Sequence, residues 1–388
     1  MYEYLFFTGV SLAAMLAAGI FIMKYWIKLI GLKSVIDPYA ESIKPHKNTK
    51  KNTFKILTYN CFLQNLSKIF TCIGSNNINE RLDEIIEHVI GDYDIVCLQE
   101  VFATSSLNVN YLIQRANELG FKWCVVPKSP DFWSRKIMDS GLVILSKHPI
   151  LDYECVSFTH KGVFSDQFAD KGFQYAKINI YGNIVHVINT HVQSDYEIHD
   201  KIACLVKLLQ YKQIKKYIDK LQKEDNNDIY LCGDLNCNAN YTRNFKIYNS
   251  TSYIYMHLTD IYDIRHGNIL TKNSDLLFDK TYPDRKYKYF GEPRPATTYS
   301  TYNKHGNEID TIWRSPDDPY LLRNNYVCLP RSVDYIILIR NSKNNYLLSN
   351  CKKCKVKNFE YEGTKSLSDH LDVYAKMKFI NSKRNNTK

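Results

Sequence analysis

The sequence predicts an α/β domain whose β-sheets are covered by helices, and three observations lead to this fold class. Short apolar runs typical of strands alternate with segments whose apolar residues recur at helical spacing. The alternation runs from residue 54 to residue 380 with no break in composition and no internal repeat. Polar residues recur where the apolar runs end, and strand ends and the loops after them are where functional side chains gather.

The individual elements follow from the same patterns. The predicted strands are short runs rich in β-branched and aromatic residues, at 54–59, 94–98, 123–127, 142–145, 173–180, 184–190, 229–232, 333–339 and 371–377. The predicted helices are amphipathic, at 81–90, 107–119 and 202–221. Tyr181-Gly182-Asn183 predicts a hairpin turn. Residues 240–330 carry the weakest patterns, which favours long loops, and 381–388 form a polar tail that we expect to be disordered.

Bulk composition limits the classes of partner. The chain has 388 residues, of which 45% are hydrophobic, enough for one large domain or two small ones. Its formal net charge of +11 favours anionic partners such as nucleic acid, anionic lipid or phosphorylated substrates, without choosing among them. The 11 cysteines form no disulfide framework, which indicates a reducing compartment. Cys351 and Cys354 form a single CxxC, and we interpret this segment as a polar loop rather than a zinc site.

The N-terminal region predicts a membrane anchor. Residues 4–23 contain no charged side chain, and twenty helical residues span roughly the 30 Å hydrocarbon core of a bilayer. A cleaved signal peptide is the alternative, but its start should carry Lys or Arg, and only Glu3 is charged here. We therefore assign 1–33 to a single-pass anchor with a basic flank, and 34–53 to a polar linker. Lysines cluster just after the span, which places the catalytic domain, 54–380, in the cytoplasm.

Two strand ends offer hard oxygen ligands. Asn60 follows the apolar run Ile56-Leu57-Thr58-Tyr59, and Glu100 follows Ile95-Val96-Cys97-Leu98. Mg²⁺ prefers a few such oxygens from the protein, with water and substrate phosphate completing its octahedron. Taken singly, each residue is more often a cap or turn residue. Together they indicate a candidate metal site.

Two histidines also stand beside predicted strands. His191 ends the run Asn189-Thr190-His191, and His370 precedes the last strand. Near neutral pH a histidine can activate water or support charge on a phosphodiester. A base histidine is usually oriented by a carboxylate, and Asp334 is our candidate for orienting His370. A lone strand-end histidine is more often structural.

The strongest local pattern is Gly233-Asp234-Leu235-Asn236 after Ile229-Tyr230-Leu231-Cys232. Residues two apart in a strand point to the same side, so Asp234 and Asn236 can act on one substrate. One could position a water or leaving group while the other donates to a phosphate oxygen. A simple turn is the competing interpretation.

Taken in their order along the chain, these polar strand ends and their neighbouring residues resemble the motifs of the endonuclease/exonuclease/phosphatase superfamily. The matching segments are Leu57-Thr58-Tyr59-Asn60, Leu98-Gln99-Glu100, Gly141-Leu142-Val143-Ile144-Leu145-Ser146-Lys147, Asn189-Thr190-His191, Gly233-Asp234-Leu235-Asn236, Val333-Asp334-Tyr335-Ile336 and Ser368-Asp369-His370. The resemblance implies a four-layer sandwich of two packed mixed β-sheets flanked by helices. It also implies a Mg²⁺-dependent phosphodiesterase.

The resemblance further implies a role for each matched residue. Glu100, Asn60 and Asp369 would serve the metal site, and Asn236 would hold the phosphate. His370 would be the general base, oriented by Asp334. His191 would stabilise the reacting phosphorus or the leaving group, and Asp234 would position or activate the reacting oxygen. The sequence leaves open whether Asp234 or His370 is the base.

Within the superfamily, the neutral sphingomyelinases look most similar. Their Lys-Gly before an apolar strand resembles Lys171-Gly172, and their Thr-His-Leu-Gln resembles Thr190-His191-Val192-Gln193. The resemblance implies that Lys171 contacts the substrate phosphate and that the partner is a membrane phospholipid, sphingomyelin, cleaved to ceramide and phosphocholine. The alternatives are a membrane-tethered nuclease or deadenylase of the same superfamily and, from another class, a catalytically inactive binding module.

Overall fold

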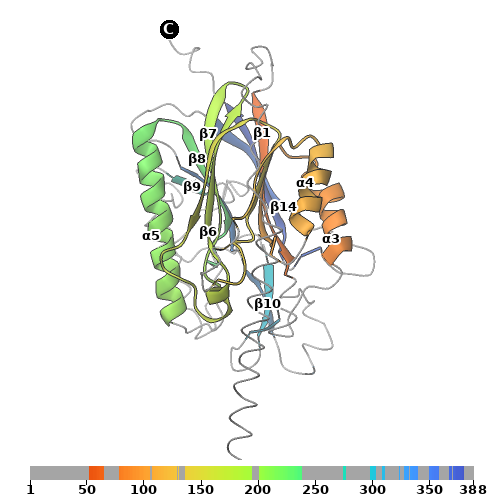
Figure 1. Cartoon of the computed structure of the whole chain (residues 1–388), viewed down its shortest axis with the longest axis vertical. Helices are drawn as coiled ribbons and strands as arrows, with labels where there is room; N and C mark the ends of the chain where they lie inside the picture. Colours follow the sequence, from red (N-terminus) through yellow and green to blue (C-terminus); the bar gives the residue numbers. More distant parts are fainter. Residues whose placement is uncertain are drawn as a thin grey trace, which may run out of the picture.

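The structure is a computed structural model of the chain. It describes residues 52–64, 78–104, 107–128, 130, 136–194, 201–237, 274–276, 298–302, 308–310, 323, 327–331, 333–339, 349–357, 367–368 and 370–379. Within these residues, two large mixed sheets pack against each other, and each is covered on its outer side by helices (Figure 1). The predicted α/β class is therefore confirmed, as are the two packed mixed sheets.

The first sheet is built around the first strand of the described residues, β1. Its strand order is β14 (Ser349–Lys357), β15 (Asp372–Phe379), β1 (Thr53–Leu63), β2 (Ile95–Val101), β4 (Val143–Ser146) and β3 (Trp123–Val125). β1 and β2 run parallel, and β1 pairs with β15 in the antiparallel sense. The sheet therefore joins residues from both ends of the domain.

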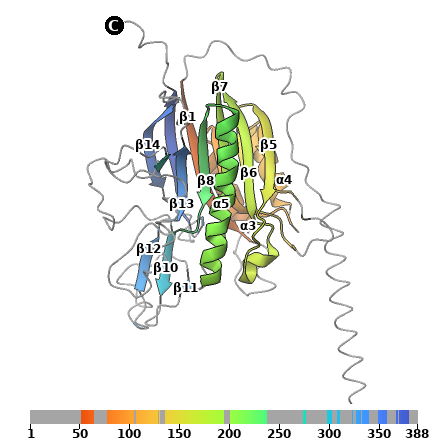
Figure 2. The same cartoon turned by 90° about the vertical axis from the view of Figure 1, so that its left-hand side faces the viewer.

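The second sheet is built around a parallel pair in the middle of the chain. Its order is β5 (Ile150–Ser157), β6 (Gly172–Ile180), β7 (Asn183–His191), β8 (Asp228–Asp234), β13 (Asp334–Ile339) and β9 (Ser274–Leu276). β7 and β8 are parallel, and β13 pairs antiparallel with β8. A small sheet of β11 (Glu308–Asp310), β10 (Thr298–Tyr302) and β12 (Val327–Arg331) lies beyond the lower ends of the large sheets (Figure 2).

Helices close the sandwich on both sides. α3 (Ile78–Glu84), the π-helix η2 (Ile85–Ile90) and α4 (Asn108–Glu118) cover the first sheet, and α5 (Lys201–Glu224) covers the second (Figure 1). The short 3-10 helix η3 (Phe164–Phe168) leads into β6. The layers therefore run helix, sheet, sheet, helix.

Alternation along the strands fills two cores. Ile56 of β1 and Ile95 of β2 point to the core between the sheets, whereas Leu57 and Val96 point to the core under α3 and α4. Successive side chains of a strand face opposite sides, so one apolar run serves both cores. Both faces of these strands are thus buried, which explains their continuous apolar sequence.

The structure adds to the sequence predictions in three places. β5 was not predicted, because its edge position leaves many of its residues, such as Asp152 and Glu154, exposed and removes the apolar alternation. Cys351 and Cys354 lie in strand β14, so the interpretation of that segment as a polar loop is wrong. The stretch 240–330, read as long loops, contributes β9 to β12 from its described parts.

The predicted anchor, with its span at 4–23, and the predicted tail at 381–388 lie outside the described residues. Of the predicted linker at 34–53, residues 34–51 also lie outside them, and Thr53 begins β1. In the part of the chain that is described, no helix is both long and apolar enough to cross a membrane. Seven cysteines whose side chains are described are free thiols: Cys61, Cys97, Cys124, Cys155, Cys204, Cys232 and Cys237.

Candidate active site

Strand register brings the candidate residues together at one end of the sandwich. In the second sheet, His191 ends β7 beside Asp234 at the end of β8, and Asp334 at the start of β13 lies on the other side of Asp234. In the first sheet, β1 and β2 run in parallel, so Asn60 and Glu100 reach the same end. Packing of the two sheets then sets these polar strand ends face to face.

Asn60 connects the two sheets within the site. Its amide nitrogen donates to Glu100 Oε1 at 3.0 Å and to Asp234 Oδ2 at 3.2 Å. Its amide oxygen accepts from the backbone N–H of Phe62 at 3.1 Å. Gln64 donates to the other oxygen of Glu100. One amide therefore holds two carboxylates that would otherwise repel each other.

The backbone is strained at two candidate residues. Glu100 has φ of 59° and Asn236 has φ of 45°, the left-handed region that residues with a side chain rarely adopt. Such conformations cost about 1–3 kcal/mol each and persist where the surrounding structure imposes them. Glu100 lies near the end of the buried strand β2, and Asn236 lies two residues after the end of β8.

Asp234 is the centre of the constellation. Its Oδ2 lies 3.6 Å from His191 Nε2 and 3.8 Å from His370 Nε2, and its Oδ1 accepts from the backbone N–H of Asn236 at 2.8 Å. Burial alone would raise the pKa of Asp234. The neighbouring His191, His370 and Lys171 and the hydrogen bond from Asn236 outweigh it, so the pKa lies below its usual value. Asp234 is therefore a carboxylate at neutral pH.

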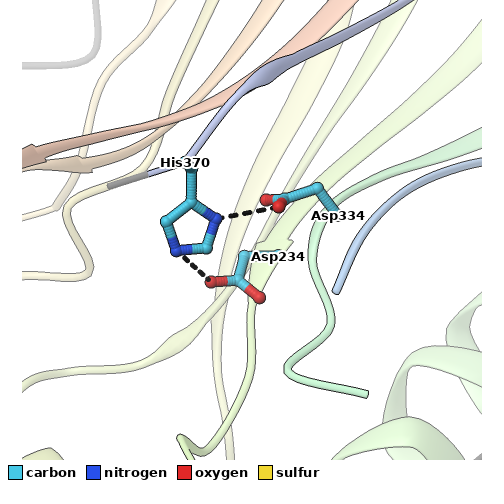
Figure 3. A group of neighbouring side chains, drawn as sticks. All are labelled: Asp234, Asp334 and His370. Atoms are coloured by element: carbon cyan, nitrogen blue, oxygen red, sulfur yellow. Dashed lines mark hydrogen bonds and ion pairs between the residues drawn. The ribbon is translucent and has the colours of Figure 1, made fainter. Parts of the chain in front are cut away.

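His370 lies between two carboxylates that come from neighbouring strands (Figure 3). Its Nδ1 is 2.8 Å from Asp334 Oδ2, and its Nε2 faces Asp234. Asp334 is fully buried, and the backbone N–H of His370 donates to Ser368 Oγ at 3.1 Å. A carboxylate on Nδ1 fixes the ring and leaves Nε2 to take a proton. The predicted pairing of Asp334 with His370 is thus present.

His191 lies on the other side of Asp234, next to Lys171. Lys171 Nζ is 3.3 Å from His191 Nε2 and 2.8 Å from Asp166 Oδ2, and it donates to Val192 O at 2.8 Å. Burial, reinforced by the Lys171 charge, lowers the pKa of His191 to about 4. His191 is therefore a neutral imidazole at physiological pH, beside a fixed positive charge.

Asn236 completes the set, and its side chain reaches toward the same place as Lys171. Its amide nitrogen donates to Val192 O at 3.2 Å, the carbonyl that also accepts from Lys171. An anion bound by one of these two side chains would lie within reach of the other.

Eight of the nine predicted site residues meet in this constellation. They are Asn60, Glu100, Lys171, His191, Asp234, Asn236, Asp334 and His370. The ninth, Asp369, lies outside the described residues. Two contacts were missed from the sequence, Gln64 on Glu100 and Asp166 on Lys171. Neither contact has a sequence signal, because each depends on how segments outside the predicted strands pack against the site.

Two groups of side chains could hold a cation. Asp234, Asp334 and His370 have ligand atoms within 4.8 Å of one another. However, the Nδ1 of His370 already pairs with Asp334, which is the arrangement of an oriented base. Glu100 and Asp234 instead offer carboxylate oxygens around one amide, the donor type that Mg²⁺ prefers. Ligation by the Asn60 oxygen would need its amide to turn, because its nitrogen faces the carboxylates.

Comparison with known proteins identifies the family to which this fold and site belong. Residues 57–370 match the Endonuclease/Exonuclease/phosphatase family, and the chain belongs to it. A sphingomyelinase of Dictyostelium discoideum is 26% identical over 283 residues, covering 64% of this chain and 58% of the relative. A sphingomyelinase C of Leptospira interrogans is 29% identical over 191 residues, covering 47% and 34%. The chain thus spans between about a third and three-fifths of these relatives' lengths.

Solved structures share the fold. Sphingomyelinase C from Streptomyces griseocarneus matches with a TM-score of 0.52 and 21% identity, covering 84% of this chain and 99% of the other. Beta toxin from Staphylococcus aureus, a mutant with bound magnesium ions, matches with 0.51 and 18%, covering 83% and 98%. TDP2 of D. rerio, complexed with single strand DNA product, matches with 0.52 and 13%, covering 84% and 99%.

Proposed function

We propose that this chain is a Mg²⁺-dependent phosphodiesterase that hydrolyses sphingomyelin to ceramide and phosphocholine. The observation that carries the proposal is the His370 ring held between Asp334 and Asp234, beside the Lys171–Asn236 pair. A base and an anion-binding pair at one place are what hydrolysis of a phosphodiester requires. The sphingomyelinase relatives support the choice of substrate.

In the proposed mechanism, His370 is the general base. Asp334 holds Nδ1, so Nε2 takes the proton of the attacking water. Asp234 is the weaker candidate, because its Oδ1 already accepts from Asn236 and its Oδ2 faces the Asn60 amide and both histidines. Its lowered pKa also makes it a poor proton acceptor at neutral pH. Asp234 then positions the water and stabilises the protonated His370.

Three side chains act on the phosphate in this proposal. Lys171 supplies a positive charge, and Asn236 donates its amide to a non-bridging oxygen. Neutral His191, whose Nε2 accepts from Lys171, donates from Nδ1 as charge develops. Because Lys171 and Asn236 both contact Val192 O, they exchange that carbonyl for the substrate.

Glu100 would hold the magnesium ion, with Asn60 and Asp369 assisting through its ligands or waters. When bound, Mg²⁺ would neutralise charge on the phosphate and stabilise the leaving oxygen. The carboxylates of Glu100 and Asp234 around the Asn60 amide support this placement, as does the magnesium in the related fold of beta toxin.

We also propose that residues 4–23 tether the domain to a membrane, with the catalytic part in the cytoplasm. The uncharged span and the lysines after it support this placement. A tether raises the effective concentration of enzyme at a substrate that lies in the same bilayer. Protease digestion of sealed membrane vesicles tests it: a cytoplasmic domain is cut without detergent.

A nuclease is the second candidate, favoured by the net charge of +11 and by the fold shared with a DNA-bound structure. A side-by-side assay separates the two. Sphingomyelin vesicles, phosphatidylcholine vesicles and single-stranded RNA are each incubated with Mg²⁺ or with EDTA. We expect phosphocholine release from sphingomyelin with Mg²⁺ only, lost in Glu100→Ala. Cleavage of RNA with sphingomyelin intact would overturn the proposal, and no turnover of any substrate would favour an inactive binding module.

A further inference from the structure

The loop after β8 is held in an unusual way. The backbone carbonyls of Leu235, Asn236 and Cys237, three in succession, each accept a hydrogen bond from a side chain elsewhere in the fold. The donors are Tyr211, Lys207 and Tyr335, in that order. All three donor residues are fully buried. A loop whose carbonyls are bound one after another by buried donors has little freedom to move.

The backbone N–H groups of Leu235 and Asn236 are bound as well. Leu235 N–H donates to Val333 O at 2.9 Å, and Asn236 N–H donates to Asp234 Oδ1 at 2.8 Å. Between these contacts Asn236 adopts φ of 45°, which costs free energy unless the surroundings impose it. The hydrogen bonds to its own carbonyl and to its neighbours provide that constraint.

Lys207 is the charged member of this group, and its side chain is fully buried. Burying an ammonium is unfavourable unless hydrogen bonds compensate for the lost water. A neutral hydroxyl is sufficient to bind a carbonyl, as Tyr211 does one turn further along α5. The bond from Lys207 joins α5 to the backbone carbonyl of the residue proposed to hold the phosphate.

We infer that Lys207 is a positioning residue that fixes Asn236, and through it the phosphate-binding side of the site. The inference rests on the proposed role of Asn236 in holding the phosphate. Lys207 and Tyr211, four residues apart, lie on one face of α5. Between them Gln210 accepts from the backbone N–H of Gln193 at 2.8 Å. One helix face thus places both the loop after β7 and the loop after β8.

A double-mutant cycle tests this inference. Lys207→Met removes the donor, and Asn236→Ala removes the side chain that Lys207 is inferred to position. In the otherwise unchanged enzyme, Lys207→Met should lower kcat/KM by about 10- to 100-fold, the effect of a small misplacement of a binding group. In the Asn236→Ala background, the same change should lower it less than about twofold, since residues that act through each other are not additive. Effects that simply multiply would overturn the inference.

If Lys207→Met does not fold, a second pair of variants with smaller changes tests the inference. Tyr211→Phe and Tyr217→Phe each remove one hydroxyl from α5, but Tyr217 contacts Glu154 on the partly exposed side and not the loop. Only Tyr211→Phe should lower kcat/KM, and Asn236→Ala should abolish the difference. Equal effects of the two would contradict the inference.

The cycle is measured on whichever phosphodiester the enzyme turns over, sphingomyelin or single-stranded RNA. If the proposed substrate is wrong, the double-mutant cycle can therefore still be measured on the true one. Inhibition by inorganic phosphate is a second measurement. Its inhibition constant should rise in Lys207→Met and stay unchanged when Lys207→Met is added to Asn236→Ala. Thermal melting of each variant verifies that it is folded.

Discussion

The surroundings of Glu100 cost folding stability and suit the binding of a cation. It is buried, it adopts a left-handed backbone, and it shares the Asn60 amide with a second carboxylate. We expect Glu100→Gln to weaken Mg²⁺ binding by at least about tenfold, because one of few hard ligands loses its charge. Isothermal titration calorimetry with Mg²⁺ measures this directly.

The same substitution should not lower the melting temperature without metal. Neutralising Glu100 removes its repulsion of Asp234, and function and stability often conflict at such sites. Glu87→Gln is the matched control, because Glu87 is exposed on η2 and pairs only loosely with Arg115. Unchanged Mg²⁺ affinity in Glu100→Gln would remove Glu100 from the metal site.

His370 and Asp334 form the second test at this scale. His370→Gln should lower kcat about 10²- to 10⁴-fold, the range for loss of a general base, with KM little changed. Asp334→Asn should give a smaller fall, since it leaves the ring in place but weakens its orientation. Steady-state kinetics measures both, with His88→Gln on the exposed side of η2 as control. A normal kcat in His370→Gln would leave Asp234 as the base.

How far single residues could be predicted depends on where their contacts lie. Glu100, Asp234 and His191 follow apolar strands, and register alone carries strand ends to one edge of a sheet. Lys207 and Asp166 have no such position. Lys207 lies in an amphipathic helix among exposed lysines, and only tertiary packing shows that its side chain is buried.

At the scale of elements, the pairing of β7 with β8 depends on Gly233. Gly233 has φ of 138°, and a Cβ there would lie 1.9 Å from the carbonyl oxygen of Thr190. Gly233→Ala should therefore destabilise the fold by about 2–4 kcal/mol, because the clash is with backbone that cannot move aside. It should also reduce activity in the folded fraction, since His191 and Asp234 end these two strands.

Gly182 is the control for this effect. It also has positive φ, 88°, but an added Cβ would meet nothing within 4 Å. Gly182→Ala should cost only about 1 kcal/mol of backbone strain. Thermal melting compares the two variants. Similar melting temperatures would show that the positive φ, and not the close approach of the strands, is the constraint at Gly233.

The end of α5 is joined to the second sheet by a charged cluster far from the site. Asp225 accepts from buried His186 at 2.8 Å and from Lys177 at 3.2 Å. Burial raises the pKa of Asp225, but these bonds and one from Asn227 N–H outweigh it and lower the pKa to about 2. The charged form therefore stabilises the fold at neutral pH, and this contribution is lost as the pH falls from about 4 to about 2.

Asp225→Asn tests that pH dependence. Because the cluster is partly exposed, we expect a loss of only about 1 kcal/mol at pH 7, or about 2 °C in melting temperature. The difference from the unsubstituted protein should shrink as the pH falls below about 4. Asp219→Asn, in the more exposed pair with Lys215, should change little. A difference that does not depend on pH would show that the charge of Asp225 is not the source.

Element prediction succeeded where burial dictates the sequence. β1, β2 and β8 are buried on both faces, so their apolar runs identify them. The edge strand β5 and the strand β14 carry polar residues that alternation cannot detect. The order of strands in the two sheets was not predicted, because register and pairing over hundreds of residues leave no local pattern.

For the whole molecule, the proposed function requires the buried site to reach a substrate that lies in a bilayer. Phe164 and Phe168 are 51% and 45% exposed, and both lie on η3, whose buried Asp166 holds Lys171. Ile202 and Leu205 in the first turns of α5 are also exposed, and α5 begins at the end of the molecule where η3 lies (Figures 1 and 2). Rings at this end could enter the interface while the site faces the headgroups.

We therefore expect the Phe164→Ala, Phe168→Ala double variant to bind sphingomyelin vesicles about 10- to 100-fold more weakly, from the apolar area it removes. Leu151→Ala is the matched control. Leu151 is 52% exposed, but it lies near Ile150, which pairs with Ile178, at the end of β5 opposite to Ser157 and the site. Co-sedimentation with vesicles measures all three proteins. Because both rings are about half exposed, we expect the double variant to lose little stability, and thermal melting verifies that weaker binding reports on the surface itself. Unchanged binding would place the membrane contact elsewhere on the chain and leave η3 with only its role in holding Lys171.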